Sequence, residues 1–248
     1  MQFKRINNIP VILVTAFLLI GLVPEKIEKE DTNRPLAIVR RVKPQVVVKH
    51  SEKREWKNVD MGEKLFNSDT LVTREKGYAA VQFMDKSLVK IKPGSMLILQ
   101  GEVKNKRSTA AQLALEFGSV FLDVKEQESS FDVTSGSAVG TVKGTEFGCS
   151  VEKNGSTRFW VAEGKVTVTA SQTGKSIDLN ERMFADITPD GVIESTGRLS
   201  RSEVKELVDE YETLDNTSVP KTLKLRFKNN DGETKEIDVN YYENDEQN

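Results

Sequence analysis

Short apolar runs separated by turn residues follow one another from residue 36 to residue 195, and this pattern constrains the fold more than any other feature. Several runs alternate apolar and polar side chains, as strands with one buried face do. Three dipeptides between runs, Asp85-Lys86, Gly118-Ser119 and Asn154-Gly155, predict tight hairpins. The sequence is therefore predicted to be mainly β, with a compact all-β domain over residues 36–195 that forms a β-sandwich or a short solenoid-like roll.

The composition limits the chemistry available to this domain. Hydrophobic residues make up 37% of the 248 residues, which is enough for a core. The 36 basic and 38 acidic residues give a net charge of −2, which argues against nucleic-acid binding because phosphate contacts need a basic excess. A single cysteine, Cys149, and a single histidine, His50, leave little for a metal centre or a catalytic triad. We expect a non-catalytic chain without a cofactor or a metal.

The N-terminus predicts export from the cytoplasm. Lys4 and Arg5 precede an apolar run, so the positive-inside rule places residues 1–8 in the cytoplasm and the rest outside. We interpret residues 9–24 as a transmembrane signal-anchor and the charged residues 25–35 as a linker. The alternative is a cleaved signal peptide, which would leave a secreted protein. The expected arrangement is a single-pass membrane protein with the bulk of the chain outside the cytoplasm.

The last part of the chain, residues 196–248, has a different pattern. Ser200 and Glu203 form a capping-box signature, and apolar residues at helical spacing follow them as far as Leu214. Two alternating runs then flank a turn at residues 230–232, which predicts a β-hairpin. A lone hairpin is marginally stable in water, so we expect this unit to pack on the β domain and to end in a frayed acidic tail.

Four segments, in this order along the chain, resemble the FecR domain, a bacterial extracytoplasmic β module. They are residues 61–73, 77–87, 139–147 and 161–168. The residues that match the family's motifs are Gly62, Asp85, Gly144, Thr145, Phe147, Glu163 and Gly164. Lys86 departs from the family pattern, which usually has glycine there, so the geometry of that turn is open. The resemblance covers roughly residues 58–190. It implies that the membrane is the inner membrane of a bacterium and that the bulk of the chain lies in the periplasm.

Most motif residues have structural roles in this interpretation. Gly144 and Gly164 suit turns or close backbone approaches, and Asp85 can accept a hydrogen bond from a turn amide. Phe147, like Phe83 and Phe121, is expected in the core. Glu146 and Glu163 could be imagined as the paired carboxylates of a glycosidase, but both stand in fold motifs, so a hydrolase is not predicted.

Four other residues have side chains that could serve a function. Trp56 and Trp160 could stack on a sugar, although packing in or beside the core is the simpler interpretation. Cys149 alternates with core residues and is expected to be a buried small hydrophobe. His50 follows a predicted strand and is expected to be exposed.

The resemblance implies a sensing role, because FecR-type proteins pass a signal from an outer-membrane transporter to a sigma factor. Eight cytoplasmic residues cannot form a folded regulator, so we expect this chain to lack that output part. The first hypothesis is a membrane-tethered binding or scaffold module that contacts an envelope protein partner through sheet edges or loops. The alternatives are the sensing subunit of a FecR-type signalling system and an envelope-polysaccharide binder that uses Trp56 or Trp160.

Overall fold

The computed structural model describes residues 34–105, 108–216, 220–228 and 234–242. The predicted transmembrane segment 9–24 and the acidic tail 243–248 lie outside these residues. Among the helices that the model describes, none combines the length and the apolar character needed to cross a bilayer.

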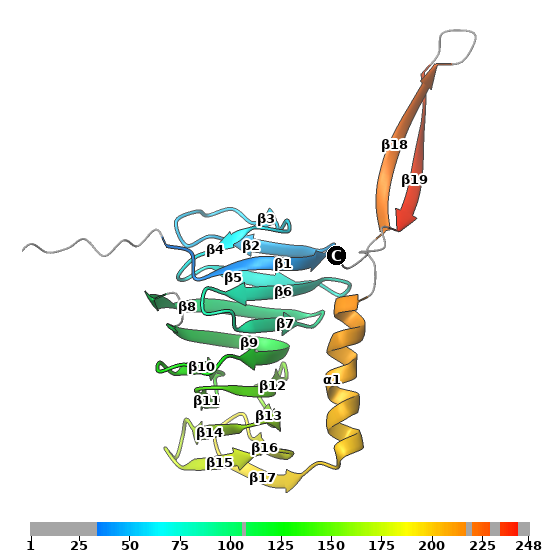
Figure 1. The fold of residues 1–248 in the computed structure, drawn as a ribbon. Helices are drawn as coiled ribbons and strands as arrows, with labels where there is room; N and C mark the ends of the chain where they lie inside the picture. The colour runs from blue at the N-terminus through cyan, green and yellow to red at the C-terminus, as the bar shows by residue number, and fades with distance from the viewer. Residues whose placement is uncertain (1–33, 106–107, 217–219, 229–233, 243–248) are drawn as a thin grey trace, which may run out of the picture. The chain divides into compact units, whose positions relative to one another are not determined.

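The strands of the body form one hydrogen-bonded network of seventeen, which folds into two β-sheet layers that share one long strand (Figure 1). Sheet A contains, in spatial order, β4 (Lys64–Leu65), β1 (Ala37–Lys43), β6 (Tyr78–Phe83), β7 (Leu88–Ile91), β9 (Ser108–Val124), β12 (Thr145–Val151), β13 (Thr157–Glu163), β16 (Met183–Ile187) and β17 (Ile193–Arg198). Sheet B contains β3 (Lys57–Asn58), β2 (Val46–Lys49), β5 (Thr70–Thr73), β8 (Ser95–Asn105), β9 again, β10 (Phe131–Thr134), β11 (Ala138–Val142), β14 (Lys165–Ala170) and β15 (Ser176–Asn180).

The long strand β9 joins the two sheets. Its first half pairs with β8 in sheet B, and its second half pairs with β7 and β12 in sheet A. Gly118, at the junction, has a φ of +101°, and a Cβ there would lie 2.4 Å from the Cα of Ser95. Only glycine tolerates both conditions, so this residue permits the change of sheet. The tight hairpin predicted at Gly118-Ser119 is wrong, because β9 continues through both residues and passes from one sheet to the other there.

The chain adds its strands to both sheets in nearly sequential order, and it crosses between the sheets every one or two strands. Two packed sheets are typical of a sandwich, whereas the sequential addition of strands along one axis is typical of a roll. The described body therefore has two packed layers and a nearly sequential strand order. The prediction of a mainly β protein is confirmed.

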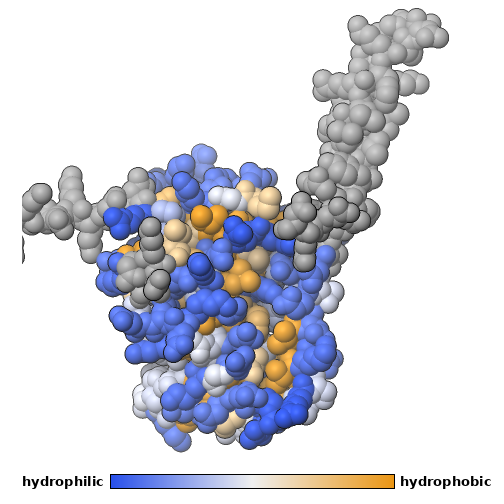
Figure 2. All heavy atoms as spheres, in the orientation of Figure 1, coloured by the Kyte–Doolittle hydropathy of each residue, from blue (hydrophilic) through white to orange (hydrophobic). Residues whose placement is uncertain are grey.

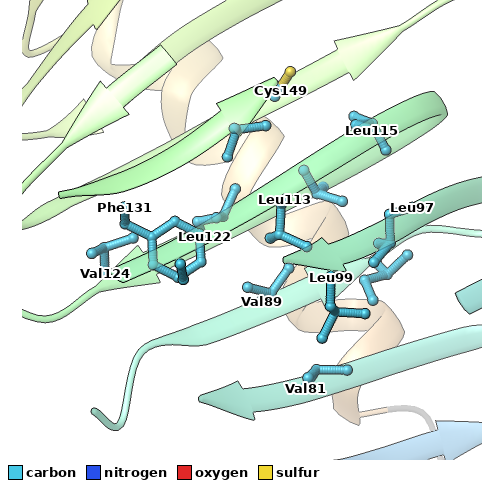
Figure 3. Packing of buried hydrophobic residues seen from close by; sticks show 14 of the residues in the cluster. Val81, Val89, Leu97, Leu99, Leu113, Leu115, Leu122, Val124, Phe131 and Cys149 are labelled. Atoms are coloured by element: carbon cyan, nitrogen blue, oxygen red, sulfur yellow. The ribbon is translucent and has the colours of Figure 1, made fainter. Parts of the chain in front are cut away.

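A single hydrophobic core fills the space between the sheets. Side chains from alternate positions of each strand point inward, as the period of two requires. The rings of Phe83 in sheet A and Phe131 in sheet B meet edge to face, with 5.0 Å between their centroids. Figure 3 shows ten labelled members of this layer, which are Val81, Val89, Leu97, Leu99, Leu113, Leu115, Leu122, Val124, Phe131 and Cys149.

One helix, α1 (Arg201–Asn216), follows β17 and runs across the strands of sheet A (Figure 1). The predicted capping box is confirmed, because the amide of Ser200 donates to Glu203 Oε2 at 2.6 Å and the amide of Glu203 donates to Ser200 Oγ at 3.2 Å. The hairpin β18 (Pro220–Lys228) and β19 (Thr234–Tyr242) pairs antiparallel, as the alternating runs predict. Its packing on the β domain stays a prediction.

Candidate interaction surface

The turn between β6 and β7 contains the motif residue Asp85. Its Oδ1 accepts a hydrogen bond from the amide of Ser87 at 2.8 Å, and the Oγ of Ser87 accepts one from the amide of Lys125 at 3.1 Å. Lys86 has a φ of +76°, the conformation that glycine adopts most easily. The turn therefore keeps the backbone geometry of a glycine turn although lysine occupies the position.

The motif residues Gly144, Thr145 and Gly164 form a second set of turns at the ends of β12 and β13. Thr145 Oγ1 donates to the carbonyl oxygen of Lys165 at 2.9 Å. Gly164 has a φ of +88°, and a Cβ there would lie 3.0 Å from the carbonyl oxygen of Gly144. These residues fix the two turns to each other, which explains why the motif combines two glycines with a threonine.

A hollow of about 360 Å³ opens beside these turns. Its lining consists of the end of β9, the turn before β12 and the turn after β13, and charged side chains of both signs dominate it. The lining residues are Asp123, Val124, Lys125, Glu126, Lys143, Gly144, Thr145, Glu146, Glu163 and Gly164. We refer to this surface as the charged hollow.

The electrostatics of the charged hollow centre on three carboxylates. Asp123, Glu146 and Glu163 stand opposite one another on neighbouring strands. Partial burial, and then repulsion from Asp123 and Glu163, raises the pKa of Glu146 above its usual value. Lys125 pairs with Asp123 at 2.7 Å and offsets part of this repulsion. The arrangement favours a ligand that brings hydrogen-bond donors or positive charge to the acidic side.

Two other motif residues lie outside the hollow lining. Phe147 is fully buried in the core between the sheets, as predicted. Gly62 belongs to the turn before β4, where its amide donates to the carbonyl oxygen of Val39 at 2.8 Å. The structure thus brings Gly144, Thr145, Glu163 and Gly164 together, whereas Phe147 and Gly62 support the fold elsewhere.

The expectation for His50 is wrong. Its side chain is only 13% exposed, because it lies between two carboxylates: Nδ1 is 2.7 Å from Asp69 Oδ2, and Nε2 is 3.4 Å from Glu63 Oε1. Asp69 is fully buried and also accepts the amides of Ser51 and Phe66. A strand-end histidine is usually solvated, and no local sequence pattern indicates that a carboxylate so distant in the chain is buried beside it.

The two tryptophans have different environments. Trp160 is only 3% exposed and packs on Phe121 and Tyr211, so the interpretation of this residue as a surface platform for sugars is corrected. Trp56 is 45% exposed, with Lys49 Nζ 5.4 Å from its ring centroid.

Cys149 is fully buried, as predicted, and burial raises the pKa of its thiol. Within the described ranges, no group of three His, Cys, Asp or Glu side chains is placed to hold a metal ion.

Sequence reasoning missed the contribution of Asp123, Lys125 and Lys143 to this surface. The hollow forms only when the end of β9 meets the turns of two later strands, so its members are spread over residues 123–164. The face in Figure 2 is mostly hydrophilic, with hydrophobic residues in small separate patches.

Comparison with known proteins gives a family match and a weak structural likeness. Residues 69–167 match the FecR protein family. No curated protein matches the sequence. Two crystal structures of a candidate anti-sigma factor from Parabacteroides distasonis are similar, each with 18% identity and a TM-score of 0.47 over 56% of this chain. The likeness spans 63% and 64% of the length of those two structures.

Proposed function

We propose, from the FecR domain that this chain carries at residues 69–167, that the protein is a signalling or regulatory module that works by binding another protein. The finer proposal is a non-catalytic scaffold in the cell envelope, anchored in the inner membrane by residues 9–24 with its β body outside the cytoplasm. Positive residues before an apolar run support this orientation.

The observation that carries the proposal is the position of the family motifs. Gly144, Thr145, Glu163 and Gly164 belong to one set of turns and line the charged hollow. Thr145 and Gly164 are engaged in holding the turns together, so their geometry serves a surface of fixed shape. A preformed surface rimmed by exposed side chains of both charges suits a polar protein segment.

Two other functions are compatible with part of these observations. The sensing subunit of a FecR-type system would use the same surface, and its partner would be a transporter or a regulator of a sigma factor. An envelope-polysaccharide binder would have to rely on Trp56, because Trp160 is covered. Trp56→Ala tests that alternative, since it should abolish any retention on cell-wall material.

Photo-crosslinking in cells tests the proposed surface. A benzophenone amino acid replaces Lys143, which is exposed at the rim of the hollow, and in a matched control it replaces the exposed Lys175 in the turn between β14 and β15. We expect a discrete protein adduct from position 143 and none from position 175. Equal adducts at both positions, or none at position 143, would contradict the proposal, and the adduct's identity separates scaffold from sensor.

Thiol labelling tests the proposed location. Cys149 is fully buried, so a thiol introduced by Lys175→Cys is the reactive one in the folded body. A membrane-impermeant maleimide should label this variant in intact spheroplasts as fully as in lysed ones. Labelling only after lysis would place the body in the cytoplasm.

A further inference from the structure

The outer face of sheet A carries a straight row of residues in register across its strands. Each member stands directly opposite the next one on the neighbouring strand. In spatial order the row is Arg41, Ala80, Lys90, Phe121, Gly148, Trp160, Phe184 and Gly197. We refer to this row as the α1 track, because α1 lies along it, starting at the end of the row beside β17 and reaching Arg41 with its last turn (Figure 1).

One half of the α1 track is an aromatic surface. The rings of Phe121 and Trp160 are stacked, with 5.6 Å between centroids and 20° between planes. Between them in the row lies Gly148, where a Cβ would be 2.2 Å from the indole. At Gly197 a Cβ would be 2.6 Å from the ring of Phe184. The glycines thus let the rings lie close against the strands.

The other half of the α1 track is basic. Lys90 is only 6% exposed although it points away from the core between the sheets. A lysine so covered requires an opposite charge from whatever covers it, because a desolvated ammonium is costly without one. Arg41 extends the positive charge toward the edge of the sheet, and Lys92 flanks the row beside Lys90.

Helix α1 matches both halves of the track. Tyr211 is its fully buried residue, with its ring 5.5 Å from that of Phe121. The partly buried Val204, Leu207 and Val208 belong to the same aromatic cluster. On the basic half, Glu212 Oε1 lies 2.5 Å from Lys90 Nζ, and Asp215 Oδ1 lies 3.5 Å from Arg41 Nε. Glu210 pairs with Lys92.

Three acidic residues of α1 lie toward its C-terminal end, where the helix dipole makes negative charge unfavourable for the helix itself. The C-terminal end of a helix carries partial negative charge, so Glu210, Glu212 and Asp215 weaken the isolated helix, and its last turn contains no basic residue. Their position is explained by the basic half of the track beneath them. The C-terminal half of the helix is therefore suited to this surface, whereas the capping box stabilises its N-terminal end.

We propose that the α1 track is a helix-binding surface, occupied within the chain by α1 and open to a helix of a protein partner that replaces it. The partner helix would present apolar residues at positions i, i+3, i+4 and i+7, followed by carboxylates within one turn. Lys90 sets this requirement, because an occupant without a carboxylate would leave its charge buried and uncompensated.

Two observations support replacement of α1. The track residues from Ala80 to Trp160 lie inside the matched FecR domain, whereas α1 begins after residue 167. The helix also keeps much of its surface in solvent: the side chains of Glu212 and Glu210 are 47% and 53% exposed, and Tyr211 is its one fully buried residue. Elements held by few buried contacts open at low free energy, well below global unfolding.

A peptide competition on the full chain, kept in mild detergent, tests this proposal. The probe is a fluorescent peptide of residues 199–216, and its binding is read by anisotropy. In the wild type α1 competes at the high effective concentration of a tethered ligand. Tyr211→Ala with Glu212→Gln loosens α1, and we expect at least tenfold tighter probe binding. Glu206→Gln, which alters an exposed acid of the same helix, should leave binding unchanged.

The selectivity of the track has its own controls. Adding Lys90→Met to the loosened variant should weaken probe binding about tenfold, and so should replacing the probe's Glu210, Glu212 and Asp215 by their amides. Equal probe binding by the wild type and the loosened variant would overturn the proposal. A loosened chain that dimerises through the track, as judged by loss of the dimer in Lys90→Met, would assign the surface to a second copy and overturn the assignment to a partner.

Hydrogen exchange of the wild type keeps the test decisive if the loosened variant fails to fold. Amides of α1 should exchange at least a hundredfold faster than amides of β12, because the helix opens without the sheets. Equal rates would mean that α1 leaves only on global unfolding, which would overturn the proposal. The charged hollow uses different residues, so either surface can fail independently of the other.

Discussion

The two faces of sheet A are made from the same strands but covered in different ways. On the inner face, side chains such as Val120, Phe147 and Phe159 pack against the strands of sheet B. On the outer face, Phe121 and Trp160 are covered by one helix. The inner face is a core that forms with the fold, whereas the outer face is a docked contact that can open separately.

The difference lies also in the kind of residue. The inner face is mostly aliphatic and aromatic, with Cys149 as a small member and Thr157 as a buried polar one that is hydrogen-bonded to Ser137. The outer face combines aromatic rings with glycines beneath them and a covered lysine, Lys90. A uniform apolar surface stabilises without discriminating, whereas a buried charge selects what can cover it. Of the two faces of sheet A, the outer one is therefore the more selective about what can cover it.

The largest expected effect is on the inner face. Phe147→Ala removes a fully buried ring from the core and should lower the free energy of unfolding by about 3–5 kcal/mol. Urea denaturation followed by circular dichroism measures the loss. Phe184→Ala, at a half-buried ring of the outer face, serves as the control and should cost clearly less. Similar losses at both positions would break the distinction between a core and a docked contact.

A smaller effect is expected when the outer face is disturbed. Gly148→Ala places a Cβ 2.2 Å from the present position of the Trp160 indole, so the ring must move. We expect a loss of about 1–3 kcal/mol, with faster hydrogen exchange in α1 and altered Trp160 fluorescence in a Trp56→Phe background. Gly136→Ala, at an exposed glycine with open space around it, is the matched control. Unchanged fluorescence in Gly148→Ala would contradict the close contact.

The inner face could be predicted from the sequence and the outer face could not. Alternation alone placed Phe83 and Phe147 in the core, and the Ser200–Glu203 capping box located the start of α1. Phe121 is buried, as expected, but it belongs to a second cluster under α1 and not to the core between the sheets. Its environment depends on the register between β9, β12 and β13, and no local sequence pattern specifies that register.

The candidate site shows the same limit. The glycine and threonine motifs predicted the turns, because the special backbone geometry of a turn leaves a local sequence signal. The hollow beside them depends on where the end of β9 meets later turns. The buried pair of His50 and Asp69 likewise joins residues whose strands pair only in the folded sheet.

A third prediction concerns the turn between β6 and β7, where backbone geometry can be tested apart from either face. Lys86 has a φ of +76°, so Lys86→Gly should relieve strain and raise the free energy of unfolding by about 0.5–1 kcal/mol. The added flexibility of the unfolded chain opposes part of this gain. Lys86→Ala keeps the Cβ and should bring no gain. Destabilisation by Lys86→Gly, measured in urea, would show that the lysine side chain is needed there.

The smallest expected effect lies at the charged hollow. Partial burial and the neighbouring Asp123 and Glu163 raise the pKa of Glu146 above its usual value of 4.5. Its charged form therefore destabilises the folded state, and this destabilisation develops as the pH rises from the usual value through the raised one. Glu146→Gln should raise the free energy of unfolding at pH 7 by a few tenths of a kcal/mol, since solvent screens this half-exposed group.

The pH dependence of that gain separates charge from packing. At pH 4 the carboxyl of Glu146 is largely protonated in both folded and unfolded chains, so the advantage of Glu146→Gln should shrink toward zero. Glu116→Gln, at an exposed acid of β9 outside the hollow, is the control in parallel urea titrations. A gain that persists at pH 4 would attribute the effect to packing. A lower free energy of unfolding for Glu146→Gln at pH 7 would mean that the charged carboxylate stabilises the folded protein. The acidic residues of the hollow would then need no ligand to offset their repulsion.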